Sequence, residues 1–132
     1  MTEFVNNSGQ GPQSAAPAEV LTGFNWGACF LNWIWGLGNK SYITLLIFVS
    51  GFAGIIPFVG MLVPFAMMIW FGIKGNEWAW QNKQWDSLEH FHSVQKTWAI
   101  WGIVLFILGI ILSVTLFAII GAVALSSGAL NK

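Results

Sequence analysis

Apolar residues run through this chain in long blocks, and the polar residues are gathered between them. Residues 43–73 and residues 97–125 contain no charged side chain. Residues 72–102 hold eight of the twelve Asp, Glu, Lys and His side chains and five of the nine tryptophans, with Trp70 just before them. Tryptophan mixed with a few charges at the edge of an apolar block is typical of a membrane–water interface, because indole has an apolar body and a polar N–H. We therefore interpret residues 72–102 as a polar-aromatic hairpin on one membrane face.

The second apolar block predicts the clearest membrane span. Its 29 residues would form about 43 Å of α-helix, enough to cross a hydrocarbon core of about 30 Å with some tilt. We expect this span at about residues 97–126. Small residues recur along it and permit close helix approach, either within a three-helix bundle or between copies of the chain. They are Gly102, Gly109, Ser113, Ala118 and Ala122.

The first apolar block allows two arrangements. Its 31 uncharged residues are too many for one straight span, and Pro57 and Pro64 interrupt them. The block is either a hairpin of two spans, at about 41–56 and 61–80, or a single kinked and tilted span. The hairpin is favoured because it puts Lys40 on the same side as the lysines of the polar-aromatic hairpin, in agreement with the positive-inside rule. It also leaves Pro57 in the connecting turn and Pro64 in the first turn of the next helix.

Residues 24–38 predict a short helix that lies in the membrane plane. The segment is too short to cross a bilayer, and at helical spacing it presents an apolar stripe and a narrow polar one. The polar stripe either faces the headgroups or packs against protein, in this chain or in a partner. Packing of Asn25 and Asn32 against protein is the hypothesis to test, because an amide that faces lipid at depth lacks a hydrogen-bonding partner. The apolar stripe contains Trp26, Phe30, Trp33 and Leu37, and the polar stripe contains Asn25, Cys29, Asn32, Gly36 and Asn39.

Residues 1–22 are rich in Asn, Gln, Ser, Gly, Pro and Ala. Such a composition buries too little apolar area to offset the entropic cost of ordering, so we expect a flexible, disordered tail. The predicted fold is all-α, with this tail followed by one helical membrane domain at residues 23–128. That domain would contain one interfacial amphipathic helix plus three transmembrane helices. The alternative has two spans, of which the first is kinked.

Composition agrees with a membrane protein and disfavours several functions. Apolar residues make up 56% of the chain and charged residues 8%, against about 25% charged in soluble domains. The chain has five lysines and no arginine, so we expect no nucleic-acid partner. His90 and His92 would point about 200° apart on a helix, and no nucleophile has a base at a readable spacing. We therefore expect no metal, no cofactor and no catalytic residue, and Cys29, the only cysteine, forms no internal disulfide.

Candidate interface residues come from the interfacial helix and the polar-aromatic hairpin. Lys74, Glu77 and Trp78 share one helical face, so they are expected to fix how the second span leaves the membrane. Tryptophans further along the chain are expected to anchor its return. The full set of candidates for contact with a partner or with lipid headgroups is Asn25, Trp26, Asn32, Trp33, Lys74, Glu77, Trp78, Trp80, Trp85, Trp98 and Trp101.

Two segments together resemble a family of small, uncharacterised bacterial multi-pass membrane proteins. They are FNWGACFLNWIWGLGNKSYITLL, residues 24–46, and GIKGNEWAWQNKQWDSLEHFHSVQKTWAIWG, residues 72–102. The resemblance covers most of the chain after residue 22, and its distinctive part is the aromatic-Gly-Asn pattern. It implies a multi-helix membrane protein of bacterial origin and supplies no catalytic residues. Some members are labelled ribonuclease G, but this chain lacks an acidic metal cluster, an Arg-rich RNA surface and the length of such an enzyme.

These observations predict a non-enzymatic integral membrane protein that serves as a small accessory or scaffold subunit. Its partners would be membrane lipids, together with a membrane protein or further copies of itself. A self-assembled channel or small-solute facilitator is the alternative, although uncharged spans disfavour a transporter acting alone. An RNA-processing enzyme is the least favoured function. The resemblance implies a bacterial inner-membrane location. The positive-inside rule predicts the orientation, with the N-terminus and residues 74–96 cytoplasmic and the C-terminus outside.

Overall fold

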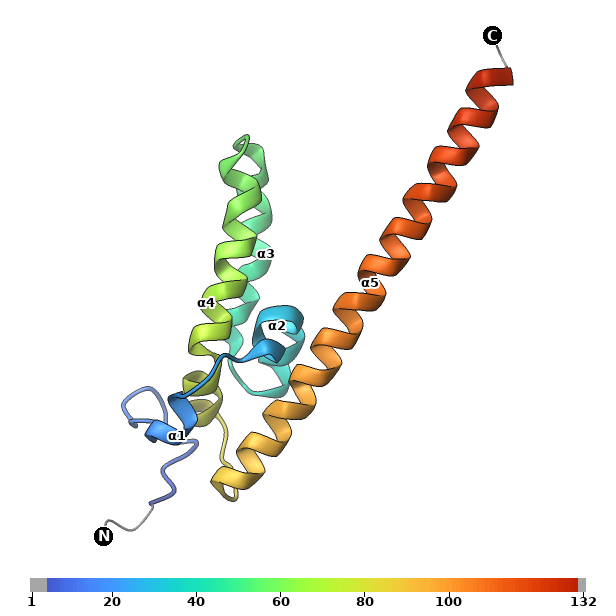
Figure 1. Cartoon of the computed structure of the whole chain (residues 1–132). Helices are drawn as coiled ribbons and strands as arrows, with labels where there is room; N and C mark the ends of the chain where they lie inside the picture. The colour runs from blue at the N-terminus through green and yellow to red at the C-terminus, as the bar shows by residue number, and fades with distance from the viewer. Residues whose placement is uncertain (1–4, 131–132) are drawn as a thin grey trace.

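The computed structural model describes residues 5–130, which form helices joined by turns and contain no strand. The prediction of an all-α fold is confirmed for this range. Figure 1 shows a folded base from which two helical arms extend and diverge. We use "base" for residues 5–41 and 71–102, "hairpin arm" for residues 42–70 and "α5 arm" for residues 103–130. The elements are α1 (Ala18–Leu21), α2 (Trp26–Gly38), η1 (Tyr42–Leu46), α3 (Ile47–Ser50), η2 (Gly51–Ile55), α4 (Val59–Asn82) and α5 (Leu88–Leu130).

The hairpin arm arises from a reversal of the chain at residues 56–58. The segment Tyr42–Ile55 runs back along α4, so the chain follows the hairpin arrangement rather than a single kinked helix (Figure 1). Pro57 lies in the turn, as expected, and Phe58 there has a left-handed backbone with φ of 67°. Because α4 begins at Val59, Pro64 lies in the second turn of the helix and not in the first. The proline therefore removes one intrahelical hydrogen bond.

Two helices, α4 and α5, are long and apolar enough to cross a membrane, whereas Tyr42–Ile55 is a shorter apolar helix. This shorter segment combines two 3₁₀ stretches with one turn of α-helix. A 3₁₀ helix rises about 2.0 Å per residue against 1.5 Å for an α-helix, so the segment reaches about 26 Å instead of about 21 Å. The 3₁₀ geometry thus lengthens a short segment toward the thickness of a bilayer.

The longest element, α5, is one continuous helix that starts in the base and forms the whole second arm. Ser87 caps its start, because the Ser87 Oγ accepts a hydrogen bond from His90 N at 3.0 Å. Its 43 residues extend about 64 Å, so the predicted span is only its distal part. Of the small residues along it, Gly102 packs against α2, since a Cβ at that position would lie 3.3 Å from the Cβ of Phe30. Gly109 has no such neighbour in this chain.

Between the two arms lies α2, which contacts both α4 and α5 in the base (Figure 1). Its bounds agree closely with the predicted helix at 24–38. It is kinked at Asn32, where φ is 27° and ψ is −95°. Asparagine adopts positive φ more readily than most residues other than glycine. The kink changes which side chains of the second half of α2 point into the base.

The base has an aromatic core to which α1, α2, α4 and α5 all contribute. The Phe91 ring receives the rings of Trp80 and Trp85 edge-on, with centroid separations of 5.6 Å and 5.1 Å. These tryptophans therefore fill an interior, although their sequence context suggested a membrane–water interface. The core connects the ends of α4 and α5 from which the two arms extend. Its largest fully buried side chains are Trp35, Trp80, Trp85, Phe71, Phe91 and Val20.

Residues 5–22 do not form a free tail, so this prediction is wrong for the described part; residues 1–4 lie outside it. This segment, the N-terminal strap, crosses the C-terminal end of α4. Gly9 N and Gly11 N donate hydrogen bonds of 2.8 Å to Trp80 O and Gln81 O. The last carbonyls of a helix have no partner within the helix, so these amides complete the end of α4. Small residues suit the strap because its backbone must approach another backbone closely.

Side chains fasten the N-terminal strap at further points. Asn7 Oδ1 accepts a hydrogen bond of 2.8 Å from Trp80 Nε1. Ser8 Oγ accepts one of 2.8 Å from Trp85 N. Val20, in α1, is fully buried in the aromatic core. These contacts to residues far along the chain explain why local composition alone suggested disorder.

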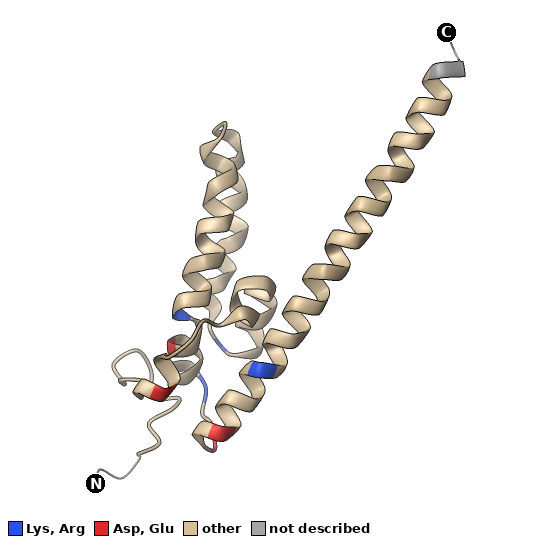
Figure 2. Ribbon diagram, viewed as in Figure 1, with Lys and Arg blue, Asp and Glu red and all other residues tan. Residues whose placement is uncertain are grey.

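All charged side chains in the described part of the chain lie in the base (Figure 2). Both arms are uncharged over residues 43–73 and 97–130. Lys74 is the first charge that follows the hairpin arm, and Lys96 is the last before the α5 arm. The molecule therefore has one polar end and two apolar extensions that leave it.

Candidate functional site

A cluster of amide side chains lies at the centre of the base, with Gln95 of α5 as its hub. Gln95 Oε1 accepts hydrogen bonds of 2.9 Å from Asn25 Nδ2 and from Trp35 Nε1. Gln95 Nε2 donates to Asn39 Oδ1 at 2.8 Å. Asn25 Nδ2 also donates to Asn76 Oδ1 at 2.8 Å. We call these four amides and one indole the amide cluster.

The amide cluster draws on both ends of α2. Asn25 is the N-cap, and its Oδ1 accepts a hydrogen bond of 2.9 Å from Ala28 N. Asn39 is the C-cap, and its Nδ2 donates to Trp35 O at 2.9 Å. Each capping residue satisfies the helix end and still has an atom free to reach the cluster. Because Asn76 comes from α4 and Gln95 from α5, the amide cluster joins three helices.

The buried polar atoms of the amide cluster are all hydrogen-bonded. Within residues 5–130, no buried side-chain nitrogen or oxygen lacks a hydrogen-bond partner. A satisfied buried network is rigid, whereas each group left without a partner costs about 1–3 kcal/mol. Amide and indole groups do not gain or lose protons near neutral pH. The amide cluster can therefore fix the positions of three helices but offers no acid–base chemistry.

The predicted row of asparagines is divided by the kink in α2. Asn25 is 3% exposed and belongs to the amide cluster, as its expected packing against protein requires. Asn32 is only half-buried, and its Oδ1 accepts a hydrogen bond of 2.8 Å from the adjacent Trp33 N. It therefore lies outside the cluster, because its backbone leaves the helical conformation at that point. Asn39, on the same stripe, does join the cluster.

Sequence reasoning missed the hub of the cluster. Gln95 recurs at helical spacing with Phe91 and Trp98 on the less polar face of its helix. A single amide on such a face is a signal that it is buried and needs partners. Trp35 carried no comparable signal, because it lies off the apolar stripe predicted for α2. Trp35 shares a buried face of α2 with Ala28 and Leu31, and its indole N–H reaches Gln95 from that face.

Several candidate tryptophans point outward from the base. Trp26 is 47% exposed and stacks on Phe30 with a centroid separation of 5.7 Å. Trp33 is also exposed, and its ring centroid lies 5.4 Å from that of Phe48 in the hairpin arm. Trp101 is 57% exposed, at the start of the α5 arm. These three occupy the level where base and arms meet.

The candidates Lys74, Trp78 and Trp85 differ in exposure and in the contacts that they make. Lys74 Nζ lies 3.3 Å from Glu77 Oε2, as the spacing predicted. Trp78 is half-buried and meets the Trp70 ring edge-on at 5.2 Å. Lys83 Nζ lies 5.1 Å from the ring centroid of Trp85. Trp85 is only 1% exposed, so it cannot anchor the chain in headgroups as expected and instead belongs to the core.

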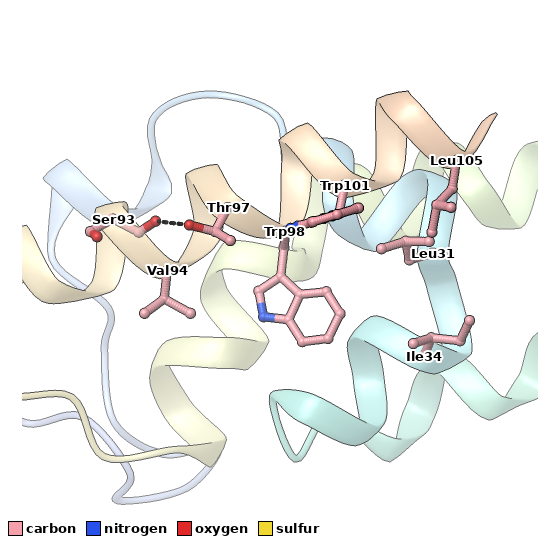
Figure 3. Close-up of a pocket in the computed structure, with 8 residues that line it drawn as sticks. All are labelled: Leu31, Ile34, Ser93, Val94, Thr97, Trp98, Trp101 and Leu105. Carbon is pink, nitrogen blue, oxygen red and sulfur yellow. Dashed lines mark hydrogen bonds between the residues drawn. The ribbon is translucent and has the colours of Figure 1, made fainter. Parts of the chain in front are cut away.

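An apolar cavity of about 390 Å³ opens between α2 and α5 (Figure 3). Trp98 projects into the space between the two helices, facing Ile34 (Figure 3). Thr97 Oγ1 donates to Ser93 O at 3.1 Å, so the hydroxyl is already used within α5. A cavity with so few polar groups suits a hydrocarbon chain better than a polar substrate. Its lining residues are Leu31, Ile34, Ser93, Val94, Thr97, Trp98, Trp101 and Leu105.

The titratable groups of the base do not converge on one point. Among the described residues, no group of three or more His, Cys, Asp or Glu side chains is placed to hold a metal ion. Burial raises the pKa of the Cys29 thiol, because it disfavours the charged thiolate. His90 Nδ1 accepts a hydrogen bond of 3.2 Å from Asp86 N at the start of α5.

Comparisons with known proteins add no relative. Neither the protein-family models nor the curated proteins nor the solved structures contain a match to this chain.

Proposed function

We propose that the protein is a non-enzymatic integral membrane protein that acts as a small accessory or scaffold subunit. The observation that carries this proposal is the contrast in burial along α5. From residue 103 to residue 128, every residue except Gly121 is exposed within this chain, although the sequence is almost entirely apolar. Exposed apolar surface costs about 25 cal/mol per Å² in water, so lipid or another protein must cover the arm.

The distribution of charge supports one orientation. The base carries the charges and exposed tryptophans typical of an interface, while both arms are uncharged (Figure 2). We propose that the arms cross a bacterial inner membrane as three spans, the first of them the short segment Tyr42–Ile55. The N-terminus and residues 74–96 would then be cytoplasmic and the C-terminus outside. The resemblance noted from the sequence is the reason for choosing a bacterial membrane.

Reporter fusions after residues 22, 57, 85 and 132 test this orientation. We expect cytoplasmic signals at 22 and 85 and external signals at 57 and 132. Opposite signals at 22 and 85, or a cytoplasmic signal at 132, would refute the three-span arrangement. A cytoplasmic signal at 57 with the others unchanged would show that the hairpin arm does not reach the far face.

The α5 arm also has a surface suited to a second helix. A concave region of about 560 Å³ lies along it, where the small residues Gly109 and Ser113 stand between Phe106 and Phe117. Small residues permit the close backbone approach through which membrane helices associate. We infer that the partner is an apolar transmembrane helix of another membrane protein. The base would hold α5 at a fixed place while this surface receives the partner.

Purification in mild detergent, with identification of every co-purifying protein, tests the scaffold function. Gly109→Leu would fill the concave region, and Gly121→Leu places the same side chain further along α5 as a matched control. We expect Gly109→Leu to lower recovery of one membrane protein about tenfold, whereas Gly121→Leu leaves it unchanged. Equal recovery with both variants, while both remain folded, would overturn the assignment of this surface.

The same concave surface favours the second candidate, a channel or small-solute facilitator built from several copies. A second copy could supply the helix that packs at Gly109. In that case the purified chain would form a discrete homo-oligomer that Gly109→Leu dissociates, and liposomes containing it would release a trapped solute. A monomer that retains a different protein would favour the scaffold.

A further inference from the structure

A second hollow, of about 210 Å³, lies where the start of α2 meets α4 and α5. It differs from the apolar cavity of Figure 3 because its lining is mixed. Aromatic rings, amides, a hydroxyl and two basic side chains contribute to it. We call it the polar hollow. Its lining residues are Thr22, Phe24, Asn25, Trp26, Asn76, His92, Gln95, Lys96 and Ala99.

The polar hollow is lined by potential cations and carries no carboxylate. Its two titratable residues are His92 and Lys96. Within the described part of the chain, Lys96 forms no ion pair. The one acidic residue of α4, Glu77, is paired with Lys74. The Lys96 ammonium is thus available as the counter-charge of an anion.

Neutral hydrogen-bond donors complete the polar hollow. Asn76 Oδ1 accepts a hydrogen bond from Asn25, which orients the Asn76 amide, and the Asn76 Nδ2 group has no acceptor among residues 5–130. The amide cluster holds Asn25 and Gln95 in place behind it. A lysine together with oriented amide donors is a suitable set for a phosphate oxygen.

The position of the polar hollow along α5 indicates where the anion comes from. Lys96 is the last charge before the uncharged arm, so the polar hollow lies where the polar base passes into apolar helix (Figure 2). Trp26, half-exposed at its edge, is a side chain typical of the headgroup level. Ala99 lines the polar hollow, and Ile103, one turn further on the same face, is exposed. An acyl chain could follow that face into the bilayer.

We propose that the polar hollow binds the phosphate group of an anionic phospholipid. The Lys96 ammonium neutralises the phosphate, the Asn76 amide and the His92 ring donate hydrogen bonds, and Trp26 covers the glycerol. The volume admits a headgroup phosphate, and the acyl chains lie along α5 outside it. The proposal rests on the membrane location in the proposed function and gives that function a specific lipid. Free phosphate shares this chemistry, so the experiment must separate the two.

The test measures lipid binding to the full chain by native mass spectrometry after delipidation in detergent. Phosphatidylglycerol, phosphatidylcholine and inorganic phosphate are added in separate titrations. We expect one tightly bound phosphatidylglycerol per chain, weaker phosphatidylcholine binding, and no displacement of the lipid by millimolar phosphate. Lys96→Gln should weaken phosphatidylglycerol binding about tenfold. The control is Lys40→Gln, which removes the same charge from an exposed position in the base outside the polar hollow. This variant should change phosphatidylglycerol binding by less than about twofold.

Three outcomes would overturn the proposal. Equal weakening by Lys96→Gln and Lys40→Gln would mean that the base attracts anionic lipid only through its general charge. Equal binding of the two lipids would remove the role of net negative charge. Displacement by inorganic phosphate would assign the polar hollow to the free anion. Circular dichroism shows whether each variant is folded, and the scaffold function is judged separately from partner recovery with Gly109→Leu.

Discussion

The arms are richer in apolar side chains than the base, yet the base buries its largest apolar side chains and the arms leave most of theirs exposed. In the base, Trp35, Trp80 and Phe91 are fully buried and every buried polar side chain is hydrogen-bonded within the described residues. In the α5 arm, large side chains such as Leu108 and Phe117 are 54% and 74% exposed. The base is therefore specified by the chain itself. The arms leave most of their apolar surface exposed within the described chain, so the chain alone does not specify what packs against them.

Two glycines show the same difference between base and arm in the space around a single atom. A Cβ added to Gly36 in the base would collide with Thr44 Oγ1 and lie 2.7 Å from Ser41 O. A Cβ added to Gly109 in the α5 arm would meet nothing within 4 Å. The first glycine is required by packing inside the chain. The second leaves room for a molecule outside it. The predictions below test whether base and arms respond as differently as this comparison implies.

The largest effect is expected for Gln95→Met, which keeps the approximate shape of the side chain and removes the hub of the amide cluster. Asn25, Trp35 and Asn39 would each lose a hydrogen bond, and the free energy of unfolding should fall on the order of 3 kcal/mol. Gln84→Met, at an exposed position, is the control and should change stability by less than about 0.5 kcal/mol. Thermal unfolding in mild detergent measures both.

The single cysteine provides a second readout of the same change. Cys29 is buried, and burial raises its thiol pKa, so little reactive thiolate is present near neutral pH. A maleimide should therefore label the native chain slowly. Gln95→Met should accelerate labelling, because opening the base exposes the thiol. Unchanged labelling and unchanged melting in this variant would show that the amide cluster does not hold the base together.

The next effect separates base from arm directly. Gly36→Ala should destabilise the chain by about 1–3 kcal/mol, because Thr44 and the backbone near Ser41 must move. Gly109→Ala should be neutral or slightly stabilising for the isolated chain, since alanine favours the helix by up to about 1 kcal/mol. Melting temperatures of both variants in detergent provide the comparison. A similar loss in both would mean that the α5 arm is packed within the chain.

A smaller effect is expected where the N-terminal strap meets the end of α4. Gly9 and Gly23 both have left-handed backbones, with φ of 76° and 88°, so alanine costs roughly 1 kcal/mol at either position. At Gly9 the new Cβ would also lie 3.0 Å from Gln84 N, whereas at Gly23 it meets nothing within 4 Å. Gly9→Ala should thus lose about 1 kcal/mol more than Gly23→Ala. The rate of hydrogen exchange at the Gly11 amide should rise in Gly9→Ala and not in Gly23→Ala. Equal stability and equal exchange rates in the two variants would indicate that the N-terminal strap is loosely held.

The smallest effect is expected for the ion pair at the root of the hairpin arm. The side chains of Lys74 and Glu77 are 46% and 32% exposed, so solvent screens their attraction. Lys74→Ala and Glu77→Gln should each cost less than about 1 kcal/mol. Trp78→Ala should be more harmful, because its ring packs against Trp70 and Phe71. Glu89→Gln, an exposed change in α5, is the control; a loss above about 2 kcal/mol for either charge variant would contradict the screened pair.

The helices of the arms were largely predictable from sequence, because a long run of uncharged, apolar residues identifies a long apolar helix. The hairpin was favoured by the long uncharged blocks, by the two prolines and by placing Lys40 on the same membrane side as the later lysines. The same features placed the ends of α4 within about two residues. The start of α5 was also readable, since Asp86, Ser87 and Glu89 form a capping pattern. Ser87 supplies the capping atom.

The base was less predictable, because its decisive contacts join residues that are distant in sequence. The N-terminal strap has no periodic pattern, and its order comes from hydrogen bonds to residues near Trp80. Trp35 is fully buried with Ala28 on one face of α2, but its hydrogen-bonding partner could not be named from that helix alone. Gln95 was visible as an isolated amide on a less polar face, but its partners could be named only after α2, α4 and α5 were placed together.

The contacts that close the base have a consequence for how the protein is made. Asn6 is hydrogen-bonded to Trp85, 79 positions later, and Asn25 to Gln95, 70 positions later. At about 5–20 residues added per second, several seconds pass between synthesis of these partners. During that interval, residues 42–70 must leave the ribosome and choose a topology. If they crossed the membrane once instead of turning back, Asn25 and Gln95 would emerge on opposite faces, and the base could not assemble. In the three-span arrangement proposed above, closure of the amide cluster would therefore be a check, late in biogenesis, that the hairpin arm has been inserted correctly.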